Sequence, residues 1–229
     1  YNLIINCDSE NKITKKFFSK KIEKNYDSRS YTTIINHKKI TNNVALQIFT
    51  KFGPLAFLPF SNTKTSIVFS LFNKKIKDQN QIVELIKKYN FKYLIKNIGD
   101  FEMYNLKFSI LRKYYYKNIL SFGDLLHKIH PLAGQGFNMT IRDIKILSSI
   151  IDEKLNIGLE LDHSILEEFE KKTKHRNYIF ASAIDFIHEF FKLDNNIKNV
   201  FSKPAFKIIG KNKILNKYAT HFANFGLDI

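Results

Sequence analysis

Two carboxylates that follow short apolar runs are the residues of this sequence best placed to hold a ligand. Asp124 comes after the apolar run 119–122 and directly after Gly123, which leaves space beside the carboxylate. Asp8 comes after the apolar run 3–6 in a similar way. A carboxylate at a strand end suits hydrogen bonding to hydroxyl groups, although Asp8 can equally well open a turn.

A glycine-containing loop comes a few residues after Asp124. It consists of Pro131, Leu132, Ala133, Gly134, Gln135 and Gly136. A helical pattern of apolar residues starts near Asn138. The two glycines let a ligand approach the backbone closely. The unpaired N–H groups at the start of the helix favour a negatively charged or electron-rich group here.

His127 and His130 are three residues apart, a spacing at which two histidines on one helical face can bind a metal ion. They precede Pro131 in a segment that we expect to be a loop, and no cysteine or carboxylate cluster nearby completes a site. We therefore expect no metal, and we assign both histidines to packing or hydrogen bonding beside the loop. Spacing gives no geometry, so we predict no catalytic residue.

These features together resemble the C-terminal flavin motif of FAD-dependent aromatic hydroxylases. The matching residues are Gly123-Asp124, the two histidines, residues 131–136, Asn138 and Arg142-Asp143. The sequence is most similar to the branch that hydroxylates polyprenylated phenols in ubiquinone biosynthesis, which resembles p-hydroxybenzoate hydroxylase in fold. The resemblance implies that Asp124 binds the ribityl chain of FAD, with Gly123 beside it and Asp8 as a further contact. It also implies that the loop and Asn138 lie along the isoalloxazine ring.

The resemblance also implies a reaction and its partners. NAD(P)H would reduce FAD, O2 would give a flavin hydroperoxide, and one oxygen atom would pass to the aromatic ring of a polyprenylated phenol. Phe57, Leu58 and Pro59 fall in strands that match the sheet over the flavin and the substrate. They are the predicted substrate contacts, with ordinary sheet core as the alternative.

Two features predict that the sequence is part of a longer protein. Both methionines, Met103 and Met139, are internal, and the G-x-G-x-x-G turn that receives the FAD pyrophosphate in this family does not occur. In the aspartate turn, Ser9 stands where the family has its second glycine, and Lys15 stands where it has an arginine. We expect activity only with an N-terminal half. The alternative is a non-catalytic remnant, a scaffold subunit or one part of a split enzyme.

The elements that must position these residues follow from hydrophobic periodicity. Short strands rich in β-branched and aromatic residues are predicted at 31–36, 44–50, 55–59, 66–71 and 107–113. Helices are predicted at 78–89 with Asp78 as cap, from about Asn138 to 151, and at 162–193 as one helix or a pair. Ser164 and Glu167 have the spacing of a capping box.

This order of elements predicts a mixed α/β fold. Residues 1–20 end a partial, Rossmann-like FAD-binding domain, and residues 21–113 form a mixed β-sheet substrate domain. Residues 114–160 return to the FAD-binding domain with the flavin-proximal loop and helix. Residues 161–229 form a C-terminal helical region.

Composition narrows the class of protein. With 44% hydrophobic residues and 4 prolines the chain reads as globular, and its single cysteine, Cys7, suits a reducing, cytoplasmic compartment. The net charge of +16 comes from lysines spread along the chain, so we expect no nucleic-acid partner. The basic, apolar tail 197–229 either rests on the inner membrane, near a ubiquinone-biosynthesis assembly, or packs against the fold.

Overall fold

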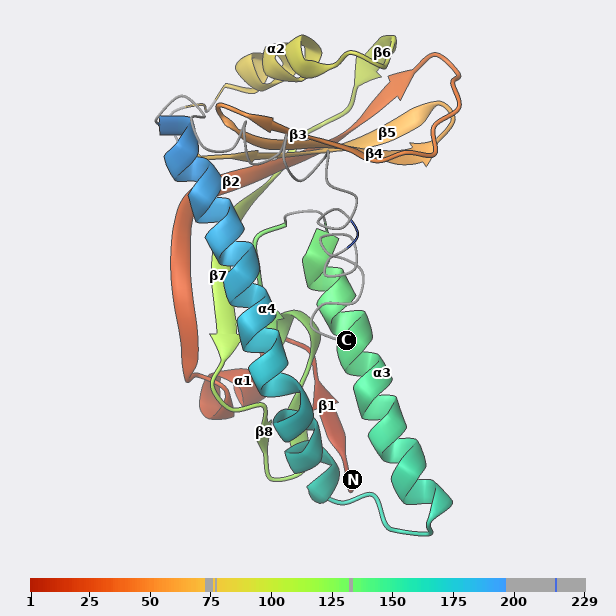
Figure 1. The fold of residues 1–229 in the computed structure, drawn as a ribbon, viewed down its shortest axis with the longest axis vertical. Coiled ribbons are helices and arrows are strands. Elements are labelled where there is room, and N and C mark those ends of the chain that lie inside the picture. The colour runs from red at the N-terminus through yellow and green to blue at the C-terminus, as the bar shows by residue number, and fades with distance from the viewer. Residues whose placement is uncertain (73–75, 77, 132–133, 197–216, 218–229) are drawn as a thin grey trace. The chain divides into compact units, whose positions relative to one another are not determined.

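The chain contributes its two end stretches to one unit and its middle stretch to another in the computed structural model, which describes residues 1–72, 76, 78–131, 134–196 and 217 (Figure 1). Unit 1 comprises Tyr1–Lys24 and Lys107–Ile229, and unit 2 comprises Asn25–Leu106. Strands β2 (Lys21–His37) and β7 (Glu102–Leu111) each carry the chain from one unit into the other. Each unit has its own hydrophobic core.

An antiparallel sheet is the frame of unit 2. Its strands are, in order, β2, β5 (Lys64–Leu71), β4 (Gly53–Ser61) and β3 (Leu46–Thr50), and β6 (Ile95–Ile98) also pairs with β2. Side chains alternate between the two faces of a strand, so one face collects the large apolar residues. On this face Leu55 is opposite Phe69 and Phe57 is opposite Ile67, and all four are buried.

Helix α2 (Gln79–Tyr89) packs against the apolar residues of this sheet (Figure 1). Asp78 caps the helix, because its side chain accepts a hydrogen bond from the Asn80 N–H at 3.0 Å. Ile82 and Ile86 lie one turn apart on the buried face of the helix. The predicted helix at 78–89 and its cap are therefore confirmed.

A three-stranded sheet organises the first part of unit 1. Its order is β1 (Ile4–Asn6), β9 (Ile119–Ser121) and β8 (Tyr115–Tyr116), with β1 and β9 parallel. Helix α1 (Lys12–Phe17) follows β1, and the 3-10 turn η1 (Gly123–Leu125) follows β9. Strand β10 (His127–Lys128) then pairs antiparallel with β7. The parallel pair brings the ends of β1 and β9 to one edge of the small sheet.

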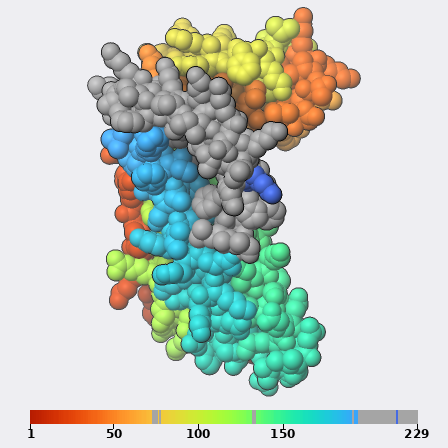
Figure 2. All heavy atoms as spheres, in the orientation of Figure 1, coloured from red at the N-terminus to blue at the C-terminus, as the bar shows by residue number. Residues whose placement is uncertain are grey.

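Two long helices, α3 (Gln135–Asn156) and α4 (Ser164–Asn196), complete unit 1 and pack along each other. Figure 2 shows the side chains of α3, in green, meeting those of α4, in cyan. Leu147 of α3 and Phe169 of α4 enter one buried cluster with Leu120 of β9. This core holds β9, and hence the start of the candidate site, against both helices.

The structure contains the five predicted strands, but it corrects several boundaries. The sequence missed α1, β6, β8 and β10, because each is too short to show a periodic pattern, and β6 and β10 also pair with strands far along the chain. Helix α3 starts at Gln135 rather than near Asn138, because Gly134 adopts the left-handed conformation directly before it. The predicted region 162–193 contains a single helix, α4.

The predicted capping box at the start of α4 is wrong. The Ser164 hydroxyl donates to Asp162 Oδ1 instead, and the Ser164 N–H donates to the same oxygen at 3.1 Å. The Glu167 N–H donates to the carbonyl of His163 at 3.2 Å. Asp162 therefore takes the role predicted for Ser164, because its carboxylate, two residues before Ser164, reaches the first N–H of the helix.

Within the described residues, every helix is too short or too polar to cross a bilayer. The predicted basic tail, 197–229, lies outside the described residues apart from Lys217. Both interpretations of the tail therefore stay predictions.

Candidate functional site

Asp8 and Asp124 follow neighbouring strands of the small sheet in unit 1. Because β1 and β9 are parallel, their carboxyl ends meet at one edge, and ligands of open α/β sheets bind outside such ends. The Phe122 N–H donates to the Asn6 carbonyl at 2.9 Å, which extends the pairing by one residue. The structure thus places the two predicted carboxylates after strand ends at the same sheet edge.

Asp124 is exposed in the turn η1. Gly123, before it, has a φ of +64°, and a Cβ built there would meet nothing within 4 Å. The next residues, Leu125 and Leu126, are buried in the core of unit 1 and anchor the turn. An accessible carboxylate on an anchored turn can accept hydrogen bonds from the hydroxyl groups of a ligand.

Asp8, in contrast, belongs to a hydrogen-bonded turn. Its Oδ1 accepts from the Glu10 N–H at 2.8 Å, and its carbonyl accepts from the Thr14 hydroxyl at 2.5 Å. Asn6 Nδ2 donates to Thr14 Oγ1 at 2.8 Å, and Asn11 Nδ2 donates to Asn6 Oδ1 at 2.7 Å. These contacts support the turn interpretation of Asp8, and its cofactor role stays a prediction. The sequence did not single out Asn6 and Thr14, because they meet only when β1 and α1 pack.

The glycine loop is described in part, because Leu132 and Ala133 lie outside the described residues. Pro131 and Gly134 are both exposed. Gly134 has a φ of +68°, and nothing lies within 4 Å of the position of a Cβ there. Other residues would be strained in this conformation, so glycine suits a turn that leads directly into α3 and leaves the backbone accessible.

Gln135, Gly136 and Asn138 lie in the first turn of α3, not in a loop before it. Among the described residues, no side chain caps this 22-residue helix at Gly134, so its first N–H groups can donate to a ligand. Gln135 is buried, and its Oε1 has no hydrogen-bond partner among the described residues. Several donors and one acceptor beside an accessible glycine fit the polar edge of a flavin ring.

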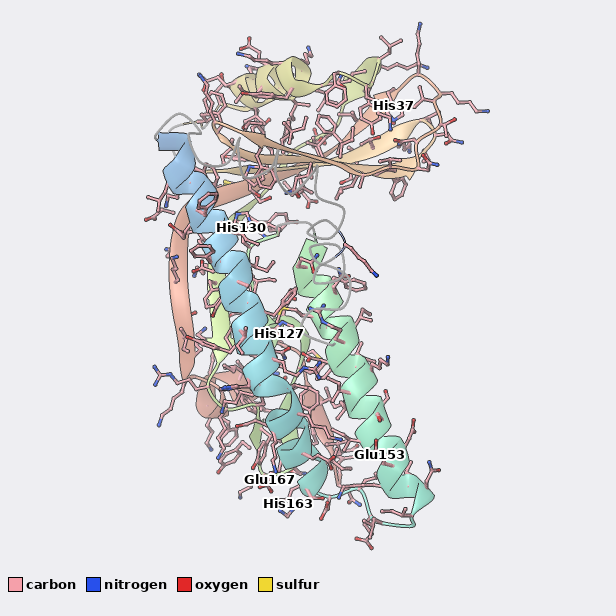
Figure 3. All side chains as sticks on the ribbon, viewed as in Figure 1. His37, His127, His130, Glu153, His163 and Glu167 are labelled. Atoms are coloured by element: carbon pink, nitrogen blue, oxygen red, sulfur yellow. The ribbon has the colours of Figure 1, made fainter. Side chains whose placement is uncertain are left out.

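A buried hydrogen-bonded group joins the elements on either side of the loop. His127 Nε2 of β10 donates to Asp143 Oδ2 of α3 at 2.7 Å. Asn177 Nδ2 of α4 donates to both carboxylate oxygens of Asp143, at 3.0 and 3.2 Å. All three residues are buried, and Figure 3 labels His127. His127 lies in a strand, so its predicted place in a loop is wrong; its pairing with distant β7 was not visible in the local sequence.

Tyr114 is buried close to this group and tilts against Phe169, with 6.4 Å between the ring centroids. Burial, and then the negative charge of Asp143, raise the pKa of Tyr114 well above its usual value. The phenol therefore keeps its proton at physiological pH. This excludes Tyr114 as a general base.

His130, directly before Pro131, packs its ring on His188 of α4 with 4.1 Å between centroids and 30° between planes. Both rings are buried (Figure 3 labels His130). Burial, with a smaller effect of His188, lowers the pKa of His130 to about 3, and burial also lowers the pKa of His188. Two neutral rings thus pack the start of the glycine loop against α4.

Asp185, His188 and Glu189 of α4 place ligand atoms within 4.8 Å of one another, as a metal site would require. Lys24 Nζ, however, lies 3.1 Å from Asp185 Oδ2 and 3.1 Å from Glu189 Oε1. A side-chain ammonium group already pairs with both carboxylates and offsets part of their negative charge. We therefore assign these residues to an ion-paired network rather than to a metal centre.

The three predicted substrate contacts have different environments on β4. Phe57 is 1% exposed and stacks on Tyr93 with 5.7 Å between centroids, inside the core of unit 2. Leu58 is 39% exposed on the opposite face, and Pro59 is half-buried. Alternation along the strand explains the difference between neighbours. Leu58 is thus the most accessible of the three.

No protein-family model matches the chain. The chain is similar in sequence to the mitochondrial ubiquinone biosynthesis monooxygenase COQ6 of Danio rerio, with 24% identity over 234 residues that cover 82% of this chain and 48% of the relative. It spans about half the length of the curated relatives it matches.

Two solved structures are similar in fold. The p-nitrophenol 4-monooxygenase PnpA from Pseudomonas putida DLL-E4 has a TM-score of 0.75 and 13% identity, over 99% of this chain and 60% of that one. PqsL, a probable FAD-dependent monooxygenase from Pseudomonas aeruginosa, has a TM-score of 0.59 and 16% identity, over 84% of this chain and 56% of that one. The predicted mixed α/β fold is confirmed.

Proposed function

We propose that this chain, a homologue of the ubiquinone-biosynthesis monooxygenases with the fold of FAD-dependent monooxygenases, is the substrate-domain and flavin-proximal half of an aromatic-ring hydroxylase. The proposed substrate is a polyprenylated phenol on the route to ubiquinone. NAD(P)H and O2 are the proposed co-substrates. The activity of the whole protein is a proposal, since the chain matches about half the length of its relatives.

The position of Asp124 is the observation that carries this proposal. Its carboxylate is exposed after β9, at the edge that β9 shares with the parallel strand β1. There it would accept hydrogen bonds from the ribityl hydroxyls of FAD, with open space at Gly123 for the chain of the cofactor. Asp8, after β1, would be a second contact at the same edge.

The loop and the start of α3 would hold the flavin ring. When bound, FAD supplies the redox chemistry, namely oxidation of NAD(P)H and activation of O2. The N–H groups at the start of α3 would stabilise negative charge at the pyrimidine edge of the ring, and Gly134 would let the backbone approach it. Pro131, Leu132 and Ala133 would shape the ring face, with Gln135, Gly136 and Asn138 beside it.

The substrate ring would lie against strand β4, with Phe57, Leu58 and Pro59 as its proposed contacts. The exposure of Leu58 supports a direct contact, whereas the buried ring of Phe57 would support the strand from the core side. The work of these residues is to orient the ring and to exclude water. No side chain is required as a nucleophile or as a metal ligand.

A polyprenylated substrate resides in lipid, so peripheral contact with the inner membrane from the cytoplasm, within a ubiquinone-biosynthesis assembly, is part of the proposal. Flotation of liposomes with the full chain and with a chain that ends at residue 196 tests the contact. We expect the full chain to float to the greater extent. Equal partitioning would refute a role of the tail in membrane contact.

Flavin binding tests the central proposal. Fluorescence titration and co-purification would be carried out on the chain and on the chain joined to the coding sequence that precedes it. We expect Asp124→Ala to weaken FAD binding by about 10- to 100-fold, since it removes an acceptor that is charged. The matched control is Asp152→Ala, because Asp152 is an exposed carboxylate on the surface of α3.

Two outcomes would contradict the proposal. If neither form of the wild-type protein binds FAD, the hydroxylase proposal fails and a scaffold or remnant takes its place. If Asp124→Ala binds FAD as tightly as Asp152→Ala, the carboxylate of Asp124 is not the ribityl contact.

A further inference from the structure

The glycine loop is tied to helix α4 on both of its sides. Before the loop, the ring of His130 packs on His188 with 4.1 Å between centroids. After the loop, Asp143 accepts two hydrogen bonds from Asn177, at 3.0 and 3.2 Å. Asn177 and His188 are three helical turns apart, about 16 Å along the axis and on one face of α4. One rigid helix thus supports both ends of the segment that carries the candidate flavin contacts.

The hydrogen bond between His127 and Asp143 links the two ends of the same segment directly. It joins the strand before the loop to the third turn of the helix after it, with 2.7 Å between Nε2 and Oδ2. The side chains of both residues are almost fully excluded from solvent, at 0% and 1% exposure. A buried carboxylate that moves away from its donors is left without compensation, so this geometry resists small displacements. The start of α3 is therefore held at one position relative to β10.

We propose that His127, Asp143 and Asn177 are positioning residues, which set the place of Gly134 and of the α3 N-terminus and thereby the fit of the flavin ring. None of the three is assigned a contact with the ligand, because each is buried in the core of unit 1. The flavin part of this inference rests on the proposed function, whereas the positioning of the loop does not. If the three residues contributed only to stability, their substitution would lower the free energy of unfolding without a specific increase in amide exchange at the start of α3.

Amide hydrogen exchange on the full chain without flavin tests the positioning directly. The informative amides are those of residues 139–142, the first in α3 that have acceptors within the helix. We expect Asp143→Asn and Asn177→Leu to speed their exchange by at least about 10-fold, since each loses hydrogen bonds of a buried group. Thr173→Val is the matched control: Thr173 is buried one turn from Asn177, and its hydroxyl donates to the Phe169 carbonyl at 2.6 Å within α4.

A double variant, Asp143→Asn with Asn177→Asp, distinguishes loss of the network from general unfolding of the single variants. It moves the carboxylate from α3 to α4 and allows both links, from His127 to residue 143 and between residues 143 and 177. We expect the double variant to restore slow exchange at residues 139–142. Failure of this restoration, or equal exchange in Asp143→Asn and in the Thr173→Val control, would overturn the positioning role.

Flavin affinity and midpoint potential, measured on the FAD-binding form of the protein, give the second readout. We expect Asn177→Leu to weaken flavin affinity by about 10-fold although Asn177 lies on α4, while Thr173→Val leaves it unchanged. Unchanged affinity and potential in Asn177→Leu would overturn the flavin part of the inference. If no wild-type form binds FAD but the exchange results hold, the positioning role stands and the proposed function fails.

Discussion

Each unit of the molecule buries a histidine at 1% exposure, but the two histidines have partners of different charge. His127 in unit 1 donates to a carboxylate, that of Asp143. Among the described residues, the ring nitrogens of His37 in unit 2 lie within hydrogen-bonding distance of two neutral groups, the Lys38 carbonyl and the Thr65 hydroxyl (Figure 3 labels both histidines). Loss of a hydrogen bond should therefore cost less free energy around His37 than around His127, where a buried carboxylate depends on its donors.

The network of unit 2 is a chain of neutral hydrogen bonds. His37 Nδ1 must carry the proton, because it lies 2.8 Å from the Lys38 carbonyl, which can only accept. Its Nε2 then accepts from the Thr65 hydroxyl at 3.0 Å. Thr65 in turn accepts from Asn42, and Asn42 accepts from the Tyr93 hydroxyl at 3.0 Å. Loss of one neutral bond leaves an unpaired polar group, which costs less free energy than an unpaired charge.

The network of unit 1 surrounds a buried carboxylate, and this difference has an energetic consequence. Asp143 has three short contacts, one from His127 and two from Asn177. A buried charge without partners costs more free energy than an unpaired neutral group. The network around the buried carboxylate lies in unit 1, which also contains Asp124, Gly134 and the start of α3.

The largest expected effect is on the free energy of unfolding after removal of each histidine. His127→Leu leaves the carboxylate of Asp143 partly unpaired and should cost about 3–5 kcal/mol. His37→Leu leaves neutral groups and should cost about 1–3 kcal/mol. Urea denaturation followed by circular dichroism measures both. Equal losses for the two variants would contradict the distinction between the networks.

A second prediction concerns pH and the other buried histidine of unit 1. The pKa of His130 is lowered by burial and by His188 to about 3, from 6.5 in the unfolded chain. As pH falls below 6.5, the unfolded chain takes up the proton first. The contribution of His130 is therefore complete above pH 6.5 and is lost as pH falls toward 3, by up to about 1.4 kcal/mol per pH unit.

Denaturant titrations between pH 7 and pH 4.5 check this loss. His130→Phe keeps an aromatic ring against His188 and should make stability fall less steeply with decreasing pH. Ile150→Val, a substitution in the hydrophobic core of unit 1 that involves no titratable group, should keep the wild-type slope. A wild-type slope in His130→Phe would show that other groups cause the acid loss.

The smallest expected effect comes from an exposed carboxylate in unit 2, the counterpart of buried Asp143. Asp78 caps α2 through one hydrogen bond to the Asn80 N–H at 3.0 Å. Asp78→Ala should cost about 1 kcal/mol, and Asp78→Ser should cost less because serine also caps helices. The thermal midpoint of each variant provides the measurement. If Asp78→Ala lowered the free energy of unfolding as much as His127→Leu, water would not replace the lost hydrogen bond to the helix N–H, and the prediction would be wrong.

Local signals in the sequence were sufficient for much of the fold. The predicted strands, the helix at 78–89 and its cap Asp78 depend on periodicity and on hydrogen bonds within a few residues. The start of α3 was placed too late because Gly134 turns the chain earlier than the apolar pattern indicates. Strand β10 was missed because two residues carry no periodicity and pair with a distant strand.

The candidate site likewise contains residues that the local sequence predicts and residues that only tertiary packing brings together. The position of Asp124 after a strand and that of Gly134 before a helix could be predicted from the sequence, since a strand end, glycines and a helix start are adjacent in the chain. Asn177 could not, because it lies 34 residues from Asp143 and reaches it only when α4 packs on α3. His188, which packs on His130, was missed for the same reason.

The sequence by itself determined which chemical groups are present and the class of fold. Helices, strands and turns form largely from interactions between residues that are close together in the chain, so residue types and their spacing are sufficient to predict them. Tertiary structure alone decided that Asp8 and Asp124 follow parallel strands at one sheet edge, and that Asp143 is buried between His127 and Asn177. Both arrangements depend on strand pairing and helix packing between segments far apart in the chain. These contacts stabilise the protein only once the segments have come together in the folded state.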